Sequence, residues 1–272
     1  MPHTLASVLT TVEELWPLAG AEGWDAPGLV SGDPASEVRS ILLAVDAVAA
    51  TVDEAIDREA DLLLAHHPLL LRGVTSVAED RYKGALLARL IRSDCALVAA
   101  HTNADVVVDG TSAVLAARLG LTAVEPISPA PDGVTGIGRV GMLAEPVTLG
   151  VLARTLADLL PPTAGGVRAA GDFHQRVERV ALCGGAGDSL LGSPAVRASD
   201  VYITADLRHH PASEAREQAT LGGGPALLDV SHWASEWLWL DTAAEQLRAA
   251  LPGVSVEVSE LRTDPWDFVI LQ

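Results

Sequence analysis

The sequence contains few cysteines, few basic residues and few aromatic residues. Of its 272 residues, two are cysteines (Cys95 and Cys183), 18 are Lys or Arg against 36 Asp or Glu, and 4% are aromatic. The cysteines lie far apart in apolar segments, so we expect buried free thiols and no thiolate metal site. The formal charge of −18, without a basic block or an aromatic–basic alternation, argues against a nucleic-acid binder.

Long apolar runs are absent as well. No run reaches the roughly 18 uncharged residues that suggest a membrane span. The N-terminus, "MPHTLASVLTTVEELW", lacks the basic start and the long apolar centre of a signal peptide. We therefore expect a soluble cytoplasmic protein with no membrane partner. The acidic surplus attracts divalent cations, but taken alone it is better explained by a solvated anionic surface.

Apolar segments alternate with alanine-rich amphipathic segments along the chain. The predicted strands lie in "SILLAVDA" (40–47), "DLLLAHH" (61–67), "ALVAAHTN" (96–103), "RVALCGGAG" (179–187), "DVYITADL" (200–207) and "ALLDVSHW" (226–233). The predicted helices lie near 5–16, 51–58, 81–92, 111–119, 148–159, 189–197, 212–219 and 234–250. This order predicts an α/β protein with a largely parallel or mixed sheet.

Two segments rich in glycine or proline divide the chain. They are "EPISPAPDGVTGIG" (125–138) and "LGGGP" (221–225). We predict a second α/β lobe at 126–225, inserted between residues 1–125 and 226–272 of a first lobe. One continuous domain with long loops is the alternative.

Polar residues that can bind a metal or carry a proton follow nearly every predicted strand. They are Asp46, His66, His67, His101, Asp105, Asp206, His209, His210, His232 and Glu236. Ligands of open α/β sheets bind outside the carboxyl ends of the strands, so we expect these side chains to converge there.

The spacing of these residues favours a metal site. His232 and Glu236 are four residues apart, which places both on one face of a helix. Either this pair or the similarly spaced His101 and Asp105 could alone be a capping or surface pair, but coincidence is a poor explanation for the whole set. His66 and His67, as neighbours on a strand held extended by Pro68, would point to opposite faces and thus reach two ions.

Two such ions need carboxylates that bridge them, and Asp105 and Glu236 are the candidates. A set of histidines and carboxylates without thiolate suits Zn, Fe, Mn, Co or Ni. The sequence therefore predicts two divalent metal ions per subunit.

Several of these segments resemble one known family. They are "EGWDAPGL" (22–29), "ADLLLAHHPLLLRG" (60–73), "AAHTNAD" (99–105), "ARLGL" (117–121), "VALCGGAGDSLL" (180–191), "DVYITADLRHH" (200–210) and "DVSHWASEW" (229–237). Together they resemble the NIF3-like family, also called the dinuclear-metal-centre proteins, some of which bear the name GTP cyclohydrolase 1 type 2 homolog. The resemblance implies a NIF3-like fold of mixed sheets flanked by helices and a toroidal homohexamer. The metal ligands that it implies are His66, His67, Asp105, His232 and Glu236.

The same resemblance suggests roles for other residues. His101 lies in or beside the site, as a substrate-contacting or supporting residue or as a structural imidazole. Asp206 and His210 are candidate proton carriers or orienting groups, whereas His209 stands where the family often has an aromatic residue. For all three, capping or packing is the competing interpretation. The glycine-rich "CGGAGDS" (183–189) is better explained as a tight structural turn than as a phosphate site.

Two functional hypotheses follow. In the first, the protein is a metal-dependent hydrolase acting on a nucleotide or phosphoester, with His210, His101 and Asp206 as catalytic residues. The cyclohydrolase name implies attack at the purine C8, opening of the imidazole ring and release of formate. In the second, it is a non-enzymatic metal-binding oligomer, for metal delivery or protein interaction. A nicotinamide-dependent enzyme is disfavoured because the GxGxxG pattern is absent.

Overall fold

The computed structural model describes residues 2–271, which form two compact units. Unit 1 contains the chain up to Val107 together with Leu240–Thr263. Unit 2 contains Val108–Trp239 and the chain from Asp264 onward. These breaks differ from the sequence-based ones at 125/126 and 225/226.

Unit 1 is built around a five-stranded sheet. Its elements are β1 (His3–Thr4), α1 (Leu5–Leu15), η1 (Leu18–Gly20), β2 (Gly28–Ser31), β3 (Glu37–Val38), β4 (Ser40–Ala44), α2 (Ala49–Asp57), β5 (Leu62–Ala65), α3 (Tyr82–Arg92), β6 (Ala96–Ala99), α4 (Thr102–Asp105), the later turns of α9 (His232–Ala250) and β15 (Ser255–Val258). The strand order is β15-β4-β5-β6-β2. Strands β15, β4, β5 and β6 run parallel, and β2 pairs antiparallel to β6.

The three central strands end in register. Ala44, Ala65 and Ala99, the last residues of β4, β5 and β6, pair across the sheet. Parallel strands expose their carboxyl ends at one edge, so the residues that follow this row enter the same space.

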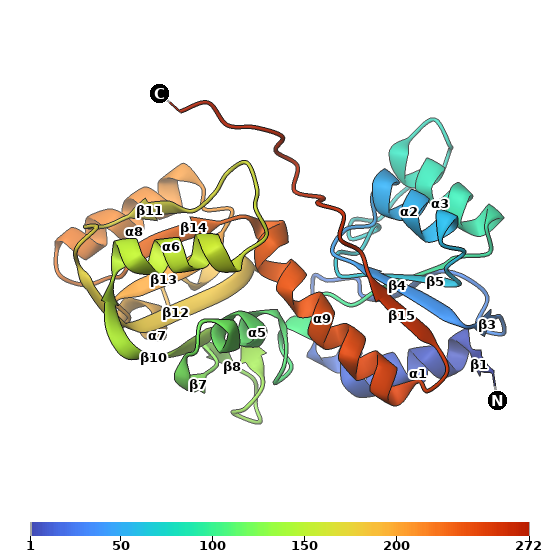
Figure 1. Cartoon of the computed structure of the whole chain (residues 1–272), viewed down its shortest axis with the longest axis horizontal. Coiled ribbons are helices and arrows are strands. Elements are labelled where there is room, and N and C mark those ends of the chain that lie inside the picture. The colour runs from blue at the N-terminus through green and yellow to red at the C-terminus, as the bar shows by residue number, and fades with distance from the viewer. Residues whose placement is uncertain (1, 272) are drawn as a thin grey trace. The chain divides into compact units, whose positions relative to one another are not determined.

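Apolar side chains cover both faces of this sheet. Leu42, Leu63 and Leu97 form one buried row that packs with α2 and α3, and Figure 1 shows these two helices on the same side of β4 and β5. Helix α1 and the later turns of α9 are joined by the bond from Trp16 Nε1 to Gln246 Oε1 at 3.2 Å. Burial on two sides explains why the central strands are uninterrupted apolar runs.

Unit 2 contains a six-stranded mixed sheet. Its elements are α5 (Thr111–Arg118), β7 (Thr122–Glu125), β8 (Ser128–Pro129), β9 (Gly136–Ile137), β10 (Arg139–Thr148), α6 (Leu149–Leu159), β11 (Arg168–Ala170), β12 (Arg176–Ala186), η2 (Asp188–Leu190), α7 (Pro194–Arg197), β13 (Val201–Ala205), α8 (His209–Thr220), β14 (Ala226–Val230) and the first turns of α9. The strand order is β11-β14-β13-β12-β10-β7. Only β12, β13 and β14 run parallel.

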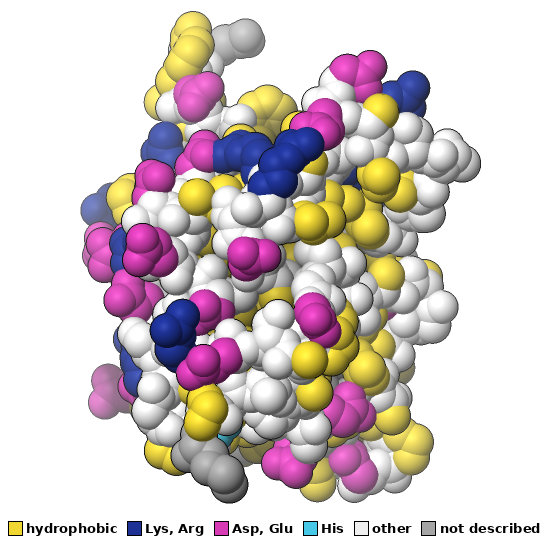
Figure 2. All heavy atoms as spheres, turned by 90° about the vertical axis from the view of Figure 1, so that its right-hand side faces the viewer, with side chains coloured by type: hydrophobic (Ala, Val, Ile, Leu, Met, Phe, Trp, Pro, Cys, Tyr) yellow, Lys and Arg dark blue, Asp and Glu magenta, His cyan; other side chains and the backbone are white. Residues whose placement is uncertain are grey.

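Strand pairing explains where the units divide. Strand β7 pairs with β10 and β14 pairs with β13, so segments that the sequence assigned to the first lobe complete the second sheet. The predicted α/β class with mixed sheets is confirmed, and each of the six predicted strands is present. None of the helices among residues 2–271 is long and apolar enough to cross a membrane. Figure 2 shows acidic side chains spread over one face of the molecule.

Candidate metal centre

Three histidines gather at the carboxyl edge of the sheet of unit 1. His66 and His67 directly follow β5, and His101 follows β6 by two residues. Their ring centroids form a nearly equilateral triangle with sides of 5.1, 5.2 and 5.4 Å. One ring nitrogen from each lies within 4.8 Å of those of the other two. His66 is fully buried, and the other two are partly buried.

His66 and His67 do not alternate across the sheet as the sequence predicted. The strand ends at Ala65, and the next two residues form a bend. The N–H groups of His66 and His67 donate in succession to the carbonyls of Ala44 and Val45, at 2.9 and 2.8 Å. Two consecutive bonds to one neighbouring strand turn the backbone, so both rings lie side by side instead of on opposite faces.

Each of these rings is held through its Nδ1 atom. Nδ1 of His66 lies 2.7 Å from the carbonyl oxygen of Ala100. Nδ1 of His67 lies 2.7 Å from Oδ1 of Asp46, and Nδ1 of His101 lies 2.7 Å from Oδ1 of Asp25. A carbonyl or carboxylate can only accept, so Nδ1 carries the proton and Nε2 of the neutral ring keeps its lone pair. Hydrogen bonds of this kind orient metal-binding histidines.

Asp105 approaches this triad from α4. Its Oδ1 lies 3.7 Å from Nε2 of His66. The segment 102–105 is a four-residue helix with His101 at its N-cap. Asn103 fixes its start, since Asn103 Oδ1 accepts from the His101 N–H at 2.9 Å and Asn103 Nδ2 donates to the Trp16 carbonyl at 2.7 Å. Asp105, a predicted ligand, therefore lies next to His66.

Electrostatics keep His101 neutral. Burial and the neighbouring His66 lower the pKa of His101 and outweigh its bond to Asp25. Burial alone would raise the pKa of Asp25, but bonds from His101 and Thr102 lower it. A neutral imidazole supported by an ionised carboxylate is the protonation state that a metal ion requires of its ligands.

Unit 2 holds a second set of donors. His232 begins α9 and Glu236 lies one turn later, with 3.0 Å between His232 Nε2 and Glu236 Oε1. Nδ1 of His232 lies 2.7 Å from Oδ2 of Asp206, which follows β13 with a φ of 57°. Asp206 therefore orients His232 as Asp46 and Asp25 orient the histidines of unit 1.

The surroundings of His232 favour positive charge. Burial alone would lower its pKa, but Glu236 and Asp206 outweigh burial and raise the pKa to about 11. Two carboxylates thus stabilise a cation at this ring, whether a proton or a metal ion.

Gly185 leaves space for the side chains of His232 and Glu236. It lies near the end of β12 with a φ of 68°, and a Cβ there would collide with Glu236 Oε1 and lie 3.1 Å from His232 Nε2. The N–H groups of Gly184 and Gly185 donate to the hydroxyls of Ser112 and Ser235, at 3.1 and 2.9 Å. Because protein hydroxyls accept these two bonds, the glycine-rich turn has a structural role here.

The residues fit divalent metal ions. Each unit offers imidazole nitrogens with fixed tautomers next to a carboxylate, and Gly185 leaves open space beside the donors of unit 2. Imidazole and carboxylate ligands without thiolate suit Zn, Fe, Mn, Co or Ni. The five predicted ligands thus form two groups, His66, His67 and Asp105 in unit 1 and His232 and Glu236 in unit 2.

The other predicted catalytic residues are placed differently. His101 lies among the candidate ligands and Asp206 contacts His232, whereas His210 is exposed near the start of α8, edge to face with His209. The sequence did not single out Asp25. Its position beside a tryptophan in "EGWDAPGL" gives no local signal for a bond to a histidine 76 residues away.

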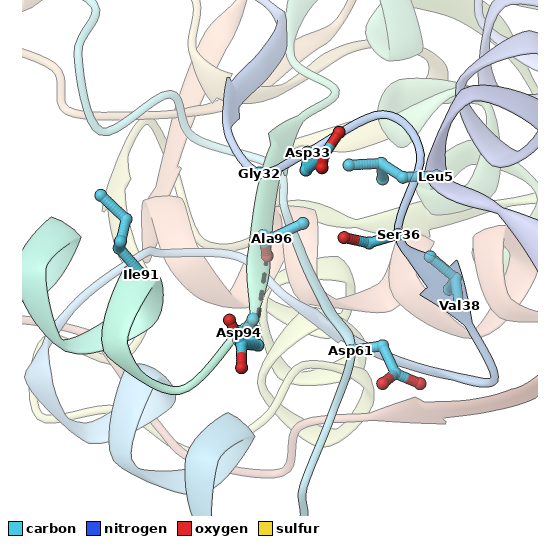
Figure 3. Close-up of a pocket in the computed structure, with 10 residues that line it drawn as sticks. Leu5, Gly32, Asp33, Ser36, Val38, Asp61, Ile91, Asp94 and Ala96 are labelled. Atoms are coloured by element: carbon cyan, nitrogen blue, oxygen red, sulfur yellow. Dashed lines mark hydrogen bonds between the residues drawn. The ribbon is translucent and has the colours of Figure 1, made fainter.

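A cavity of about 300 Å³ lies elsewhere in unit 1 (Figure 3). Asp61 and Cys95, which precede β5 and β6, line it, so it lies at the amino ends of these strands. Burial raises the pKa of the Cys95 thiol to about 11, so this thiol is not a nucleophile at neutral pH. The cavity contains none of the candidate ligands, and we assign the metal chemistry to the opposite end of the strands.

Comparison with known proteins identifies the family of this chain. The model of the family Duf34/NIF3 (NGG1p interacting factor 3) matches residues 3–265. The chain belongs to this family. A Duf34/NIF3 relative from Streptomyces coelicolor, named GTP cyclohydrolase 1 type 2 homolog, is 47% identical over 98% of this chain and 94% of its own length. A relative of the same name from Clostridium perfringens is 31% identical over 97% and 99%.

Solved structures share the Duf34/NIF3 fold. A crystal structure of a Staphylococcus aureus protein superposes with a TM-score of 0.89 at 25% identity, over 99% of this chain and all of that one. The Bacillus cereus protein related to NIF3 gives 0.88 at 23% identity, with the same coverage, and supports the fold alone.

Proposed function

We propose that this Duf34/NIF3 protein is a metal-dependent hydrolase that binds two divalent ions per subunit and acts on a nucleotide or another phosphoester. The observation that carries the proposal is the common arrangement of four histidines, each with Nδ1 held by an oxygen acceptor that fixes the tautomer of the neutral ring. A structural histidine requires no such tautomer, so its repetition supports a metal centre.

The proposed ligands are His66, His67, Asp105, His232 and Glu236, as predicted. We add His101 as a ligand in place of its predicted catalytic role, because its ring completes the triad of unit 1. Divalent ions supply Lewis acidity and activate water when bound.

The surrounding residues orient the ligands and move protons. Asp206, Asp46 and Asp25 fix the rings that they contact. His210 remains the proposed proton carrier, since its imidazole is exposed near the start of α8. The name of the relatives makes GTP the first substrate to test, with ring opening and formate release as the readout.

We also propose the toroidal homohexamer that the resemblance implies. Acidic side chains are spread over the face shown in Figure 2, and none of the helices among residues 2–271 is long and apolar enough to cross a membrane. The partner that we propose is a second copy of the same chain.

The test combines metal analysis with turnover. Wild type, Glu236→Gln and His210→Ala are purified, analysed for metals and assayed with GTP and a panel of phosphoesters. Glu245→Gln is the matched control, since Glu245 is an exposed residue of the same helix. We expect stoichiometric metal and turnover in wild type and Glu245→Gln, loss of both in Glu236→Gln, and loss of turnover alone in His210→Ala.

Two outcomes contradict the proposal in different ways. Wild type without metal after expression in supplemented medium refutes the metal centre. Wild type with metal, but with no more turnover than Glu236→Gln, leaves the non-enzymatic metal-binding protein as the better account.

A further inference from the structure

An exposed tryptophan stands next to the histidine triad. Trp24 is 61% exposed, and its ring centroid lies 5.9 Å from that of His101, with the two planes at 79°. Single apolar side chains on a surface are common and need no explanation. The position of Trp24 requires an explanation, because the adjacent His101 ring is a candidate metal ligand.

The backbone around Trp24 is tied down although its ring is open to solvent. The segment Glu22–Asp25 is a turn closed by the bond from Asp25 N–H to the Glu22 carbonyl at 2.9 Å. Thr102 binds both ends of this turn, since Thr102 Oγ1 accepts from Glu22 N–H at 2.9 Å and Thr102 N–H donates to Asp25 Oδ2 at 3.0 Å.

One carboxylate connects the turn that carries Trp24 to the histidine. The Asp25 side chain is fully buried and holds Nδ1 of His101 through Oδ1. The backbone next to Trp24 is therefore tied to His101, and the two rings are in edge-to-face contact. A ring that is both positioned and exposed can bind a ligand without reorganisation, which lowers the entropic cost of binding.

We propose that Trp24 is a stacking platform for a nucleobase, which places the base of a nucleotide substrate beside the metal centre. This inference rests on the proposed function and narrows its substrate class to nucleotides. An aromatic face stacks on every base, so Trp24 favours nucleotides over aliphatic phosphoesters and does not select guanine over adenine.

The test measures binding, without reliance on turnover. Guanosine 5′-monophosphate and ribose 5-phosphate are titrated calorimetrically into the protein as purified, because the second ligand keeps the phosphate and the sugar but has a hydroxyl group in place of the base. Wild type is compared with Trp24→Ala, Trp24→Phe and Tyr82→Ala. Tyr82 is the control, as a 67% exposed aromatic residue of unit 1 whose ring contacts Lys83.

We expect Trp24→Ala to weaken binding of the nucleotide by about 10-fold or more and to leave ribose 5-phosphate binding and metal content unchanged. Trp24→Phe is expected to retain most of the affinity, and Tyr82→Ala all of it.

Three results would contradict the proposed role of Trp24 as a stacking platform. They are equal affinity of wild type for the two ligands, unchanged nucleotide binding in Trp24→Ala, and loss of metal in Trp24→Ala, which would make Trp24 a support of His101. Wild type that lacks metal refutes the proposed function instead, so the two failures are distinguishable.

Discussion

Carboxylates that accept a hydrogen bond from Nδ1 of a histidine determine which ring nitrogen faces a metal ion. Asp25 is the most enclosed of them, since it is fully buried and accepts bonds from His101 and Thr102. An amide in its place keeps the shape of the side chain but removes the charge that supports the imidazole. The ring is then less basic and its orientation is less well fixed.

Asp25→Asn is therefore expected to lower metal affinity by about 10- to 100-fold with little change in fold. Affinity is measured by competition with a chromophoric chelator, and the fold by circular dichroism. Asp33→Asn is the control, because Asp33 is exposed and its Oδ1 accepts only a local bond from the Ala35 N–H. Equal affinity of Asp25→Asn and wild type would show that this carboxylate does not support a ligand.

Gly185 gives a second prediction about single residues. Gly185→Ala adds a Cβ against Glu236 and His232, and it also strains a backbone with a φ of 68°. Gly120 has the same φ, but a Cβ there would meet no atom within 4 Å. Both alanine variants are expected to lose about 1–2 kcal/mol of stability from left-handed strain, and only Gly185→Ala is expected to lose metal.

Thermal unfolding and metal analysis of both variants separate these effects. A decrease in Tm in both variants, with metal lost from Gly185→Ala alone, supports the steric role of Gly185. Full metal content in Gly185→Ala would exclude it.

At the scale of whole elements, the parallel strands position the ligands. Leu63 lies at the centre of the buried row shared by β4, β5 and β6. Leu63→Ala is expected to destabilise the fold by about 2–5 kcal/mol, through lost apolar burial and the cavity that remains. Urea unfolding followed by circular dichroism measures this change in the free energy of unfolding.

Leu18→Ala is the matched control, because the Leu18 side chain is 47% exposed. It is expected to change stability by no more than about 0.5 kcal/mol. A comparable loss in both variants would mean that the row around Leu63 is not the centre of the core.

Burial also decides which elements were predictable. Strands β5 and β13 are buried along their length, so their apolar runs identified them in the sequence. Strand β7 is exposed at all four positions and lies at the edge of its sheet, so no apolar pattern marked it. The pairing of β7 with β10 in the second sheet therefore had no signal in the sequence.

The candidate ligands were predictable because they follow buried strands. The aspartates that orient these histidines were less predictable. The hydrogen bonds of Asp46 to His67 and of Asp206 to His232 depend on which strands are neighbours in the sheet. Strand order is a property of the folded chain, and short apolar runs do not encode it locally. The sequence placed both aspartates at strand ends without revealing which histidine each would hold.

At the scale of the whole molecule, the acidic surface and the proposed hexamer lead to one further prediction. Size-exclusion chromatography with light scattering at about 0.15 M salt is expected to give six times the chain mass of 28.2 kDa. Low ionic strength should weaken the assembly, because the repulsion between chains of charge −18 is then less screened. A monomeric mass at every salt concentration would contradict the hexamer.

The register that aligns Ala44, Ala65 and Ala99 makes the site sensitive to chain length. His67 and His101 each follow this row by two residues, so their positions are counted from main-chain hydrogen bonds of the sheet. One residue inserted between Ala65 and His66 would move both histidines of that segment away from His101. An insertion in the exposed loop at 72–81, which lies after the bend, would leave this count unchanged. We therefore expect variants that keep the metal site to tolerate insertions and deletions in such loops. The number of residues between each strand end and its ligand should stay constant.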